Sequence, residues 1–278
     1  MTYDSEIALR AIALIAGIGV SISGLEDLAM LKCFSDQGLL SWEVNRLENR
    51  WSTLGPLSTL MNRLISFRCF RFVLLARMLS AVLVAAAASV SSLNPTLLFV
   101  VFASSAILSL RSRYGLDGAH QMWLVLFGSL FLAHIRPPGD IARVAALWFI
   151  AIQTGLSYFV AGAYKTVSRS WWNGQGLIGV LGTITYGNNT LYKLVTGHLL
   201  IARLVSWAIM VFECSFWFVF VGDTRIVPFM LALGVIFHVG VALTMGLNDF
   251  LLAFPAAYPA VVYCVSGSGI VLSAIRGS

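Results

Sequence analysis

Long apolar runs separated by polar segments dominate the chain. A helix that crosses a bilayer needs about 20 mostly apolar residues. By this criterion the pattern predicts membrane helices at residues 8–24, 70–91, 95–110, 121–135, 142–164, 199–221, 226–245 and 250–271. The runs at 95–110 and 121–135 are short, and tilted or partly re-entrant helices fit them as well. We therefore expect an all-α fold, a polytopic membrane helix bundle with about eight spans.

Two long segments interrupt the apolar runs, at residues 25–69 and 166–197. The first mixes apolar residues with Arg46, Glu48 and Arg50, so it is either a surface loop or an amphipathic helix lying on the membrane. The second mixes glycine, aromatic and polar residues, and an interfacial or re-entrant loop fits it better than a further span. We see no internal repeat, and we expect one transmembrane domain over residues 1–278.

Composition supports a membrane protein. The chain is 59% apolar and only 11% charged, whereas soluble domains are about 25% charged. The net charge is +6, but the basic residues are scattered at the ends of the apolar runs. We interpret them as topology signals, so membrane lipid is an expected partner and nucleic acid is not.

One stretch, residues 158–177, combines the features of a functional site. An apolar helix is predicted to end near Lys165, and Trp171, Trp172, Asn173 and Gly174 follow. Lys165 alone could be an interfacial anchor, because a lysine stem can extend to the headgroups. The paired tryptophans suit a membrane boundary and the glycines allow close backbone approach. The stretch therefore also fits a lysine whose amine points into a cavity, roofed by the Trp171 loop.

Two more polar residues lie deep in apolar runs, Glu213 and His238. Charged groups in hydrocarbon are costly, so each is a candidate site residue. Their helices are expected to be antiparallel neighbours, which predicts a direct or water-bridged pair, either structural or acting as a proton relay or cofactor clamp. Arg77 lies closer to a helix end and is expected to snorkel. No metal-binding, hydrolase or nucleotide-binding motif occurs in the sequence, and we expect no metal.

Several motifs carry a family resemblance. The sequence reads YFVAGAYK at 158–165, WWNG at 171–174, FHVG at 237–240 and MGLNDF at 245–250, with FSDQGLLSW at 34–42. In this order the motifs resemble the HTTM family, which includes the vitamin K-dependent gamma-carboxylases and shorter bacterial membrane proteins. The chain is closer to the short bacterial members, some of which belong to systems that mature secreted peptides such as the sporulation-delaying peptides.

The resemblance implies roles for particular residues. It implies Lys165 as a base toward a reduced quinone, with His238 and Glu213 in support as catalytic residues. The residues expected to bind substrate are Trp171, Trp172, Asn173, Gly174, Asn248 and Arg113. One position departs from the carboxylases, which carry an Asn-His pair before a glycine like Gly118; here the nearest histidine, His120, follows that glycine.

Two functions follow as expectations. The first is a membrane enzyme that modifies a secreted peptide or lipid-like substrate with Lys165 as base; the resemblance implies that it lies in the bacterial inner membrane. The second is a non-catalytic membrane subunit that binds a small secreted peptide and presents it to partner proteins in a maturation, export or immunity system. A neutral amine in an apolar pocket suits the first, because burial disfavours the charged form of lysine.

Overall fold

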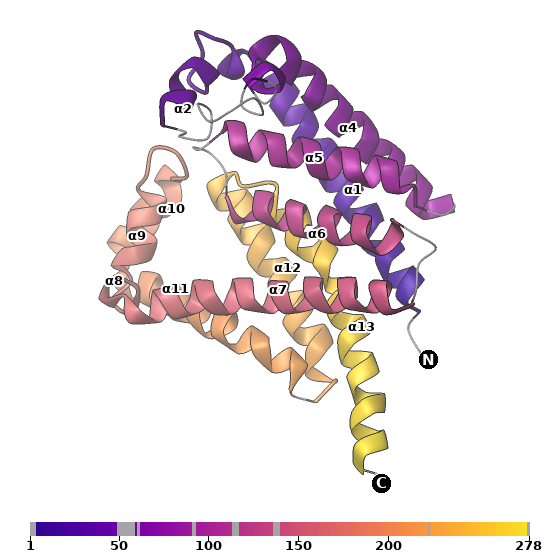
Figure 1. Cartoon of the computed structure of the whole chain (residues 1–278). Coiled ribbons are helices and arrows are strands. Elements are labelled where there is room, and N and C mark those ends of the chain that lie inside the picture. The colour runs from indigo at the N-terminus through magenta and orange to yellow at the C-terminus, as the bar shows by residue number, and fades with distance from the viewer. Residues whose placement is uncertain are drawn as a thin grey trace. The chain divides into compact units, whose positions relative to one another are not determined.

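The computed structural model describes residues 4–48, 59, 62–90, 93–112, 117–135, 140–221 and 223–276. Within these ranges the regular elements are helices and no strand occurs, which confirms the all-α class. In chain order they are α1 (Ser5–Ala29), the 3-10 helix η1 (Leu31–Phe34), α2 (Trp42–Glu48), α4 (Phe67–Val90), α5 (Pro95–Arg111), α6 (Gly118–His134), α7 (Asp140–Val167), α8 (Arg169–Trp172), α9 (Gln175–Leu181), α10 (Asn189–Gly197), α11 (Leu199–Ser215), the 3-10 helix η3 (Phe216–Phe220), α12 (Ile226–Met245) and α13 (Phe250–Arg276) (Figure 1).

Helix starts follow from local capping chemistry. The side chain of Asn94 accepts a hydrogen bond from the Thr96 amide, and a proline follows Asn94 at the first helical position of α5. The Asp117 carboxylate accepts from the amides of Ala119 and His120 at the start of α6. These caps satisfy amides that have no partner inside the helix. They place the breaks between helices where the apolar runs are interrupted.

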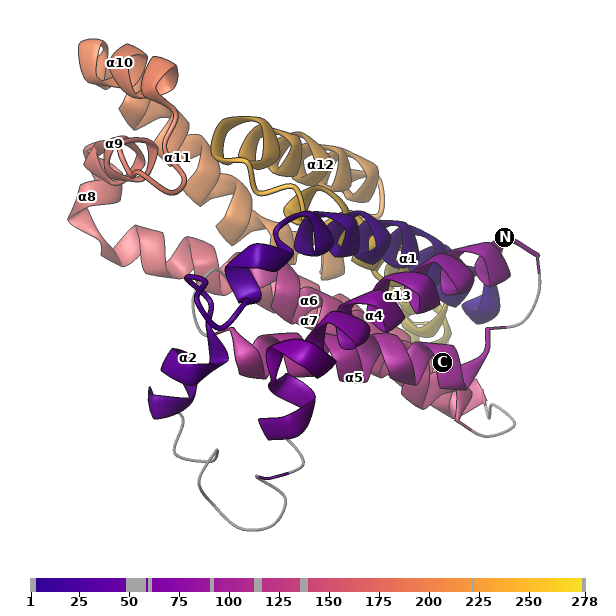
Figure 2. The same cartoon turned by 90° about the horizontal axis from the view of Figure 1, so that it is seen from above.

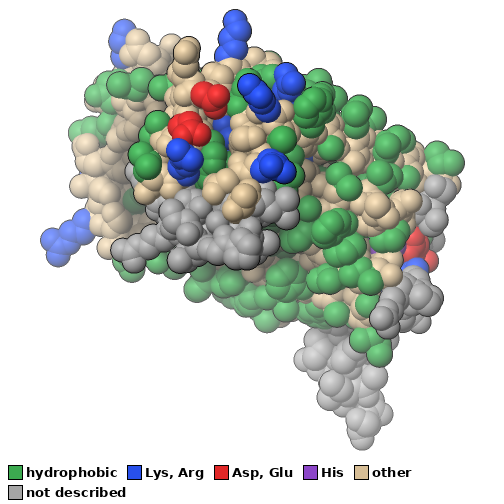
Figure 3. Space-filling view, turned by 45° about the horizontal axis from the view of Figure 1, so that its top comes forward, with side chains coloured by type: hydrophobic (Ala, Val, Ile, Leu, Met, Phe, Trp, Pro, Cys, Tyr) green, Lys and Arg blue, Asp and Glu red, His purple; other side chains and the backbone are tan. Residues whose placement is uncertain are grey.

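Five helices are long and apolar enough to cross a membrane. They are α1, α4, α7, α11 continued by η3, and α12. Helix α5 and the first part of α13, Phe250–Ser266, are apolar but shorter. On the face drawn in Figure 3, hydrophobic side chains cover much of the surface and charged side chains are few. The chain is therefore an integral membrane protein, as composition indicated.

The chain divides into two compact units. The N-terminal unit is Leu9–Ala146, and the C-terminal unit is Leu147–Ser278 together with Met1–Ala8. Each unit has its own packed helices and its own buried polar cluster, so we describe them separately.

In the N-terminal unit, α5 packs against both α4 and α6, and Figure 2 shows α4 and α5 side by side. The segment 25–69 is attached to this bundle through Arg111 at the end of α5. The buried Arg111 guanidinium donates hydrogen bonds to the backbone carbonyls of Phe34 and Ile65, and it lies 4.4 Å from the ring centroid of Phe70. Part of the segment expected as a surface loop, η1, is thus anchored by an arginine that satisfies its carbonyls.

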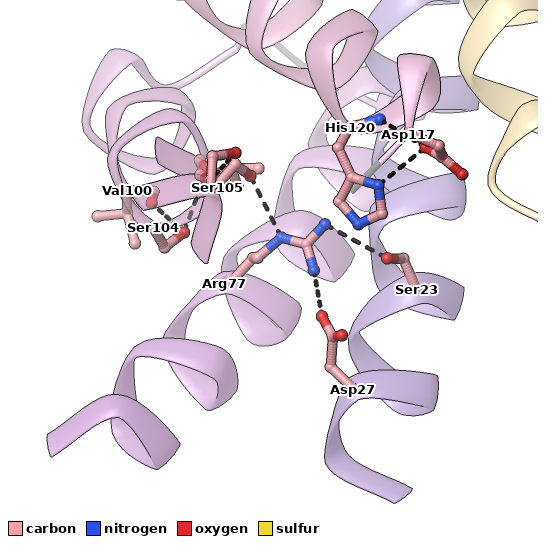
Figure 4. A network of polar contacts seen from close by, with 10 residues as sticks. Ser23, Asp27, Arg77, Val100, Ser104, Ser105, Asp117 and His120 are labelled. Atoms are coloured by element: carbon pink, nitrogen blue, oxygen red, sulfur yellow. Dashed lines mark hydrogen bonds and ion pairs between the residues drawn. The ribbon is translucent and has the colours of Figure 1, made fainter. Parts of the chain in front are cut away.

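Arg77, in the middle of α4, does not snorkel. Its side chain is fully buried and donates to Asp27 Oδ2 at 2.8 Å, Ser105 Oγ at 3.2 Å and Ser23 Oγ at 3.4 Å (Figure 4). The expectation was wrong because α1 continues past its apolar run and brings a carboxylate to the arginine. A buried charge with an ion-pair partner and further hydrogen bonds is tolerated inside a bundle.

In the C-terminal unit, α7 runs antiparallel to α11 and η3. A Cβ added at Gly155 would lie 2.9 Å from Trp217, and one at Gly162 would lie 2.9 Å from the Cys214 amide. Contacts thus move backward along α11 as the chain moves forward along α7. Small residues let two membrane helices approach this closely.

The segment 166–197 is largely helical. It forms α8, α9 and α10, which pack on the start of α11 around a buried apolar cluster. The cluster comprises Ile178, Leu181, Val195 and Ala202. We call residues 168–207 the cap of the C-terminal unit.

Candidate functional site

One face of α7 carries the candidate site. Tyr158, Gly162 and Lys165 follow one another at spacings of four and three residues, which places them on the same side of a helix. This side faces α11, because Gly162 contacts Glu213 and Cys214 and the Tyr158 ring contacts Phe212. The Tyr158 hydroxyl and the Lys165 amine are thereby held on the side of α7 that faces α11, about two helical turns apart along the helix axis.

Lys165 forms an ion pair with Glu213. The Lys165 Nζ atom donates to both carboxylate oxygens, at 2.8 Å and 2.7 Å, and lies 3.5 Å from the carbonyl of Ala161. The Glu213 side chain is 4% exposed and that of Lys165 is 20% exposed. Glu213 lies about 21 Å along α11 from its first residue, at about 1.5 Å per residue. The amine is therefore held at the level of a membrane-crossing stretch, and its partner is a carboxylate rather than headgroups.

Trp171 covers the amine. The Lys165 Nζ lies 5.2 Å from the Trp171 ring centroid, which is a cation–π distance. The Trp171 ring also lies against Gly176, where an added Cβ would be 2.9 Å from the indole. A side chain at Gly176 would displace Trp171, so the glycine is needed for this cover.

The neighbouring predicted residues shape the cap. The Trp172 indole donates to the Thr166 carbonyl at 2.6 Å, and the Trp207 indole donates to the Trp172 carbonyl at 3.0 Å. Asn173 accepts a hydrogen bond from the Gln175 amide through its side chain. These bonds fix α8 beside α11.

Gly174 supplies the sharp turn between α8 and α9. Its φ of 84° lies in the left-handed region that favours glycine, and an added Cβ would lie 2.9 Å from the Arg203 amide. Of the residues expected to bind substrate, Trp171 therefore contacts Lys165, while Trp172, Asn173 and Gly174 build the cap that holds Trp171 in place.

His238 belongs to a different cluster. Its Nε2 atom is hydrogen-bonded to the Tyr158 hydroxyl at 2.6 Å, and that hydroxyl is also bonded to the Tyr258 hydroxyl at 2.8 Å. Both Glu213 and His238 are buried as expected, at 3% and 1% exposed. No direct hydrogen bond joins them among the described residues, because the facing α7 supplies a partner to each: Lys165 to Glu213, and Tyr158 to His238. The water-bridged pair stays a prediction.

An aromatic shell encloses this second cluster. The His238 ring stacks on Phe254 with centroids 4.6 Å apart, and the Tyr158 ring contacts Phe216 at 4.2 Å. Gly234 makes room for it, since an added Cβ would lie 2.1 Å from the Tyr258 hydroxyl oxygen. The His238 Nδ1 atom is buried and has no hydrogen-bond partner among the described residues.

The remaining predicted residues lie elsewhere. Asn248 is exposed in the turn that joins α12 to α13, and Arg113 lies outside the described residues. Sequence reasoning missed Tyr258 as a site residue, although a tyrosine hydroxyl between Pro255 and Pro259 in an apolar run is a signal that it needs a buried partner. Tyr158 belongs to the YFVAGAYK motif, but the sequence alone assigns its hydroxyl no role.

The arrangement supports proton chemistry. The ion pair can move one proton between an amine and a carboxylate, and the tyrosine–histidine cluster can hold a proton at any of four polar atoms, the two hydroxyl oxygens and the two ring nitrogens of His238. No group of three or more His, Cys, Asp and Glu side chains is placed to hold a metal ion in the part of the chain that the structure describes.

No protein-family model matches this chain, and neither a curated protein nor a solved structure matches it. A functional proposal therefore has to rest on the geometry of the two clusters and on the motifs that they contain.

Proposed function

We propose that this chain is a membrane enzyme that modifies a secreted peptide or a lipid-like substrate by acid–base chemistry at Lys165. The observation that carries the proposal is the buried ion pair of Lys165 and Glu213, at 2.7 and 2.8 Å within membrane-crossing helices. Removing two charges from water is costly, so an ionic pair in such a place is a candidate functional site.

The pair can generate a base without releasing a proton to solvent. Transfer of one proton from the Lys165 ammonium to the Glu213 carboxylate leaves a neutral amine beside a neutral carboxylic acid. The amine lone pair then accepts a proton from the substrate, and the pair carries that proton until it is lost. Neutralising both groups together also relieves the cost of keeping two charges in an apolar site.

Substrate would reach the amine from the side of the cap. The Lys165 side chain is one-fifth exposed whereas Glu213 is nearly enclosed, so the amine is the accessible member of the pair. Trp171 covers the amine and supplies an apolar wall for a hydrophobic substrate. Gly174 fixes the turn after it, and Asn248 remains a proposed substrate contact on the strength of its motif, MGLNDF. The role expected for Arg113, which lies outside the described residues, stays a prediction.

The family resemblance extends the proposal to topology and location. An HTTM-like protein would cross the bacterial inner membrane about eight times, with α5, α6 and α13 added to the five longer spans. A small secreted peptide and the partner proteins of a maturation system are the partners that this assignment favours.

A reduced quinone, the cofactor that the resemblance implies, fits the cluster around His238. The fit is supported by the buried His238 Nδ1, which has no hydrogen-bond partner among the described residues, and by the stacked rings of Phe250 and Phe254. These residues would hold the ring, and Nδ1 would bind one of its oxygen atoms. When bound, the hydroquinone would supply reducing equivalents.

A second candidate is a non-catalytic subunit that binds a peptide and presents it to partners. The observation that favours it is the closure of the pair: both Glu213 oxygens already bind the Lys165 amine. A closed pair of this kind can have a purely structural role, which is to hold α7 against α11. In that role the positive charge of residue 165 is needed, but the loss of its proton is not.

Lys165→Arg separates the two candidates. Arginine keeps the positive charge and can bind a carboxylate through two N–H groups, but it does not deprotonate in proteins. We would delete the gene, identify by mass spectrometry the secreted peptide or lipid species that is lost, and restore the wild type, Lys165→Arg or Lys165→Met. The base role predicts that neither variant restores the product by more than about 1%.

Membrane expression of each variant is the control. If Lys165→Arg restores the product fully while Lys165→Met does not, the amine is a structural cation and the subunit function is correct. If both variants restore it, the ion pair has no part in the function.

A further inference from the structure

The cap of the C-terminal unit is basic over its whole length. Between residues 166 and 212 the sequence contains no aspartate and no glutamate, whereas Arg169, Lys193 and Arg203 are present. All three side chains are exposed. Among the described residues, none of the three forms an ion pair.

These cations belong to three elements that pack together: α10 and α11 share the apolar cluster, and α8 contacts α9 and α11. Arg169 is in α8, Lys193 in α10 and Arg203 in α11, and α9 and α10 pack beside the start of α11 (Figure 2). Val195 and Ala202 are buried in that cluster while Lys193 and Arg203, close to them in sequence, point outward. The fold therefore places the charges on the outside of a defined structure rather than on a loose loop.

Exposed apolar side chains accompany the charges. Trp172 and Trp207 are about half exposed, and their indole N–H groups are both bound to backbone carbonyls. Ile184, at the tip between α9 and α10, is fully exposed. Tryptophan beside basic residues is typical of the boundary between hydrocarbon and headgroups.

The opposite end of α11 lacks this character. The turn before α12 carries one acid and one base, Asp223 and Arg225, and the Asp223 side chain accepts from the Arg225 amide. In α2 of the other unit, Arg46 is likewise paired with Glu43. Exposed cations without an ion pair also occur in the described part of the N-terminal unit, at Lys32, Arg63 and Arg68, but acidic residues such as Asp36 lie in the same segment. The cap differs in that its sequence contains no acidic residue.

We infer that the cap binds the headgroups of anionic phospholipids. Phosphate oxygens accept hydrogen bonds from guanidinium and ammonium groups, and the absence of carboxylates from the cap sequence removes the repulsion that would oppose them. The apolar side chains enter the layer just below the phosphates. This surface is independent of the chemistry proposed for Lys165, so either can fail without the other.

Lipid titration of the purified protein tests the inference. The delipidated protein in detergent would be titrated with phosphatidylglycerol or phosphatidylcholine, and bound lipids counted by native mass spectrometry. Changing Arg169, Lys193 or Arg203 to Gln should weaken phosphatidylglycerol binding about fivefold each, and the triple variant on the order of a hundredfold. Binding of phosphatidylcholine should not change.

Arg225→Gln is the matched control, because it removes one exposed positive charge at the other end of α11. It should leave the preference for phosphatidylglycerol intact, and salt should weaken that preference in the wild type. The inference is overturned if the wild type binds both lipids equally or if Arg225→Gln acts like the cap variants. It is also overturned if soluble glycerol phosphate competes as well as the lipid, since the site would then bind free phosphate.

Discussion

At the scale of single residues, cost in hydrocarbon identifies site residues but not their partners. Glu213 and His238 stand out because polar groups deep in apolar runs are expensive, and Lys165 stands out because of the tryptophans and glycines that follow it. Their partners depend on how each helix is rotated about its axis, and α11 and α12 are apolar around most of their circumference, so the sequence does not fix that rotation. Matched depth suggested Glu213 with His238; the structure instead turns both toward α7.

Breaking the ion pair from one side should cost more than removing it. Glu213→Leu leaves the Lys165 amine without its carboxylate, and we expect a loss of about 3 kcal/mol in the free energy of unfolding. The double variant Lys165→Met with Glu213→Leu replaces the pair by apolar side chains and should recover most of that loss. Unfolding of the detergent-solubilised protein in increasing dodecyl sulfate measures both.

The single and double variants also test whether Lys165 and Glu213 are energetically coupled. Suppose that Glu213→Leu alone and the double variant are destabilised equally. Removing the Lys165 amine would then bring no recovery, so the amine in the Glu213→Leu variant would not be a buried charge without a partner. The Lys165–Glu213 contact would then contribute nothing beyond packing.

The Tyr158 hydroxyl should matter more than that of Tyr258. Tyr158→Phe removes a hydroxyl bound to both His238 and Tyr258, and leaves two buried polar groups without it. Leaving a buried polar group without a partner costs about 1–3 kcal/mol. Tyr258→Phe removes only one of these bonds and should destabilise less in the same assay. Equal losses would show that the tyrosine–histidine bond adds no stability.

At the scale of elements, the apolar pattern predicted helices well and their ends less well. Each of the eight predicted runs overlaps a helix, and the run 226–245 coincides with α12, while the run 199–221 covers both α11 and η3. Helix α1 continues beyond the predicted residue 24, because Asp27 is stabilised by Arg77 of a distant helix. The short helices α8–α10 were missed because their shared core, which includes Ile178 and Val195, forms only when the chain folds back on α11.

Gly162 should be required for the approach of α7 to α11. An added Cβ would lie 2.9 Å from the Cys214 amide, a backbone atom that cannot move without its helix. Overpacking costs about 1–3 kcal/mol, against a helix-propensity gain of about 1 kcal/mol for Gly→Ala. We expect Gly162→Ala to be destabilising, and also to lower whatever activity depends on the Lys165–Glu213 pair.

Gly240→Ala is the comparison for that change. Gly240 also lies inside a membrane-crossing helix, but an added Cβ would meet no atom within 4 Å. We expect this variant to be neutral or slightly stabilised. If both alanine variants behave alike in thermal melts, close packing at Gly162 is not what holds the two helices.

At the scale of the whole molecule, composition was sufficient to predict a helical membrane protein, because so few charges cannot cover a soluble surface. It could not predict that the chain forms two compact units. Nor could it predict that each unit has its own charged cluster, around Arg77 in one and Lys165 in the other. Such clusters are assembled from residues distant in sequence, so neither apolar periodicity nor motif spacing predicts which residues they contain.

The number of spans determines on which side of the membrane the proposed substrate residues lie. If α5 and α6 cross the membrane along with the longer helices, alternation puts cysteines introduced at Arg113, Asn173 and Asn248 on one side. Cysteines at Ser92 and Asp223 would then face the other side. In a variant lacking the native cysteines, an impermeant maleimide added to intact cells should label only one of the two sets. If α5 and α6 do not cross, position 113 lies on the same side of the membrane as Ser92 and Asp223. Arg113 then cannot bind the same substrate as Asn173 and Asn248. If the cysteines at positions 113 and 248 are labelled together or protected together, the result supports eight spans, with all the proposed substrate residues on one side of the membrane. The result is clear-cut because a bilayer separates the two sets completely.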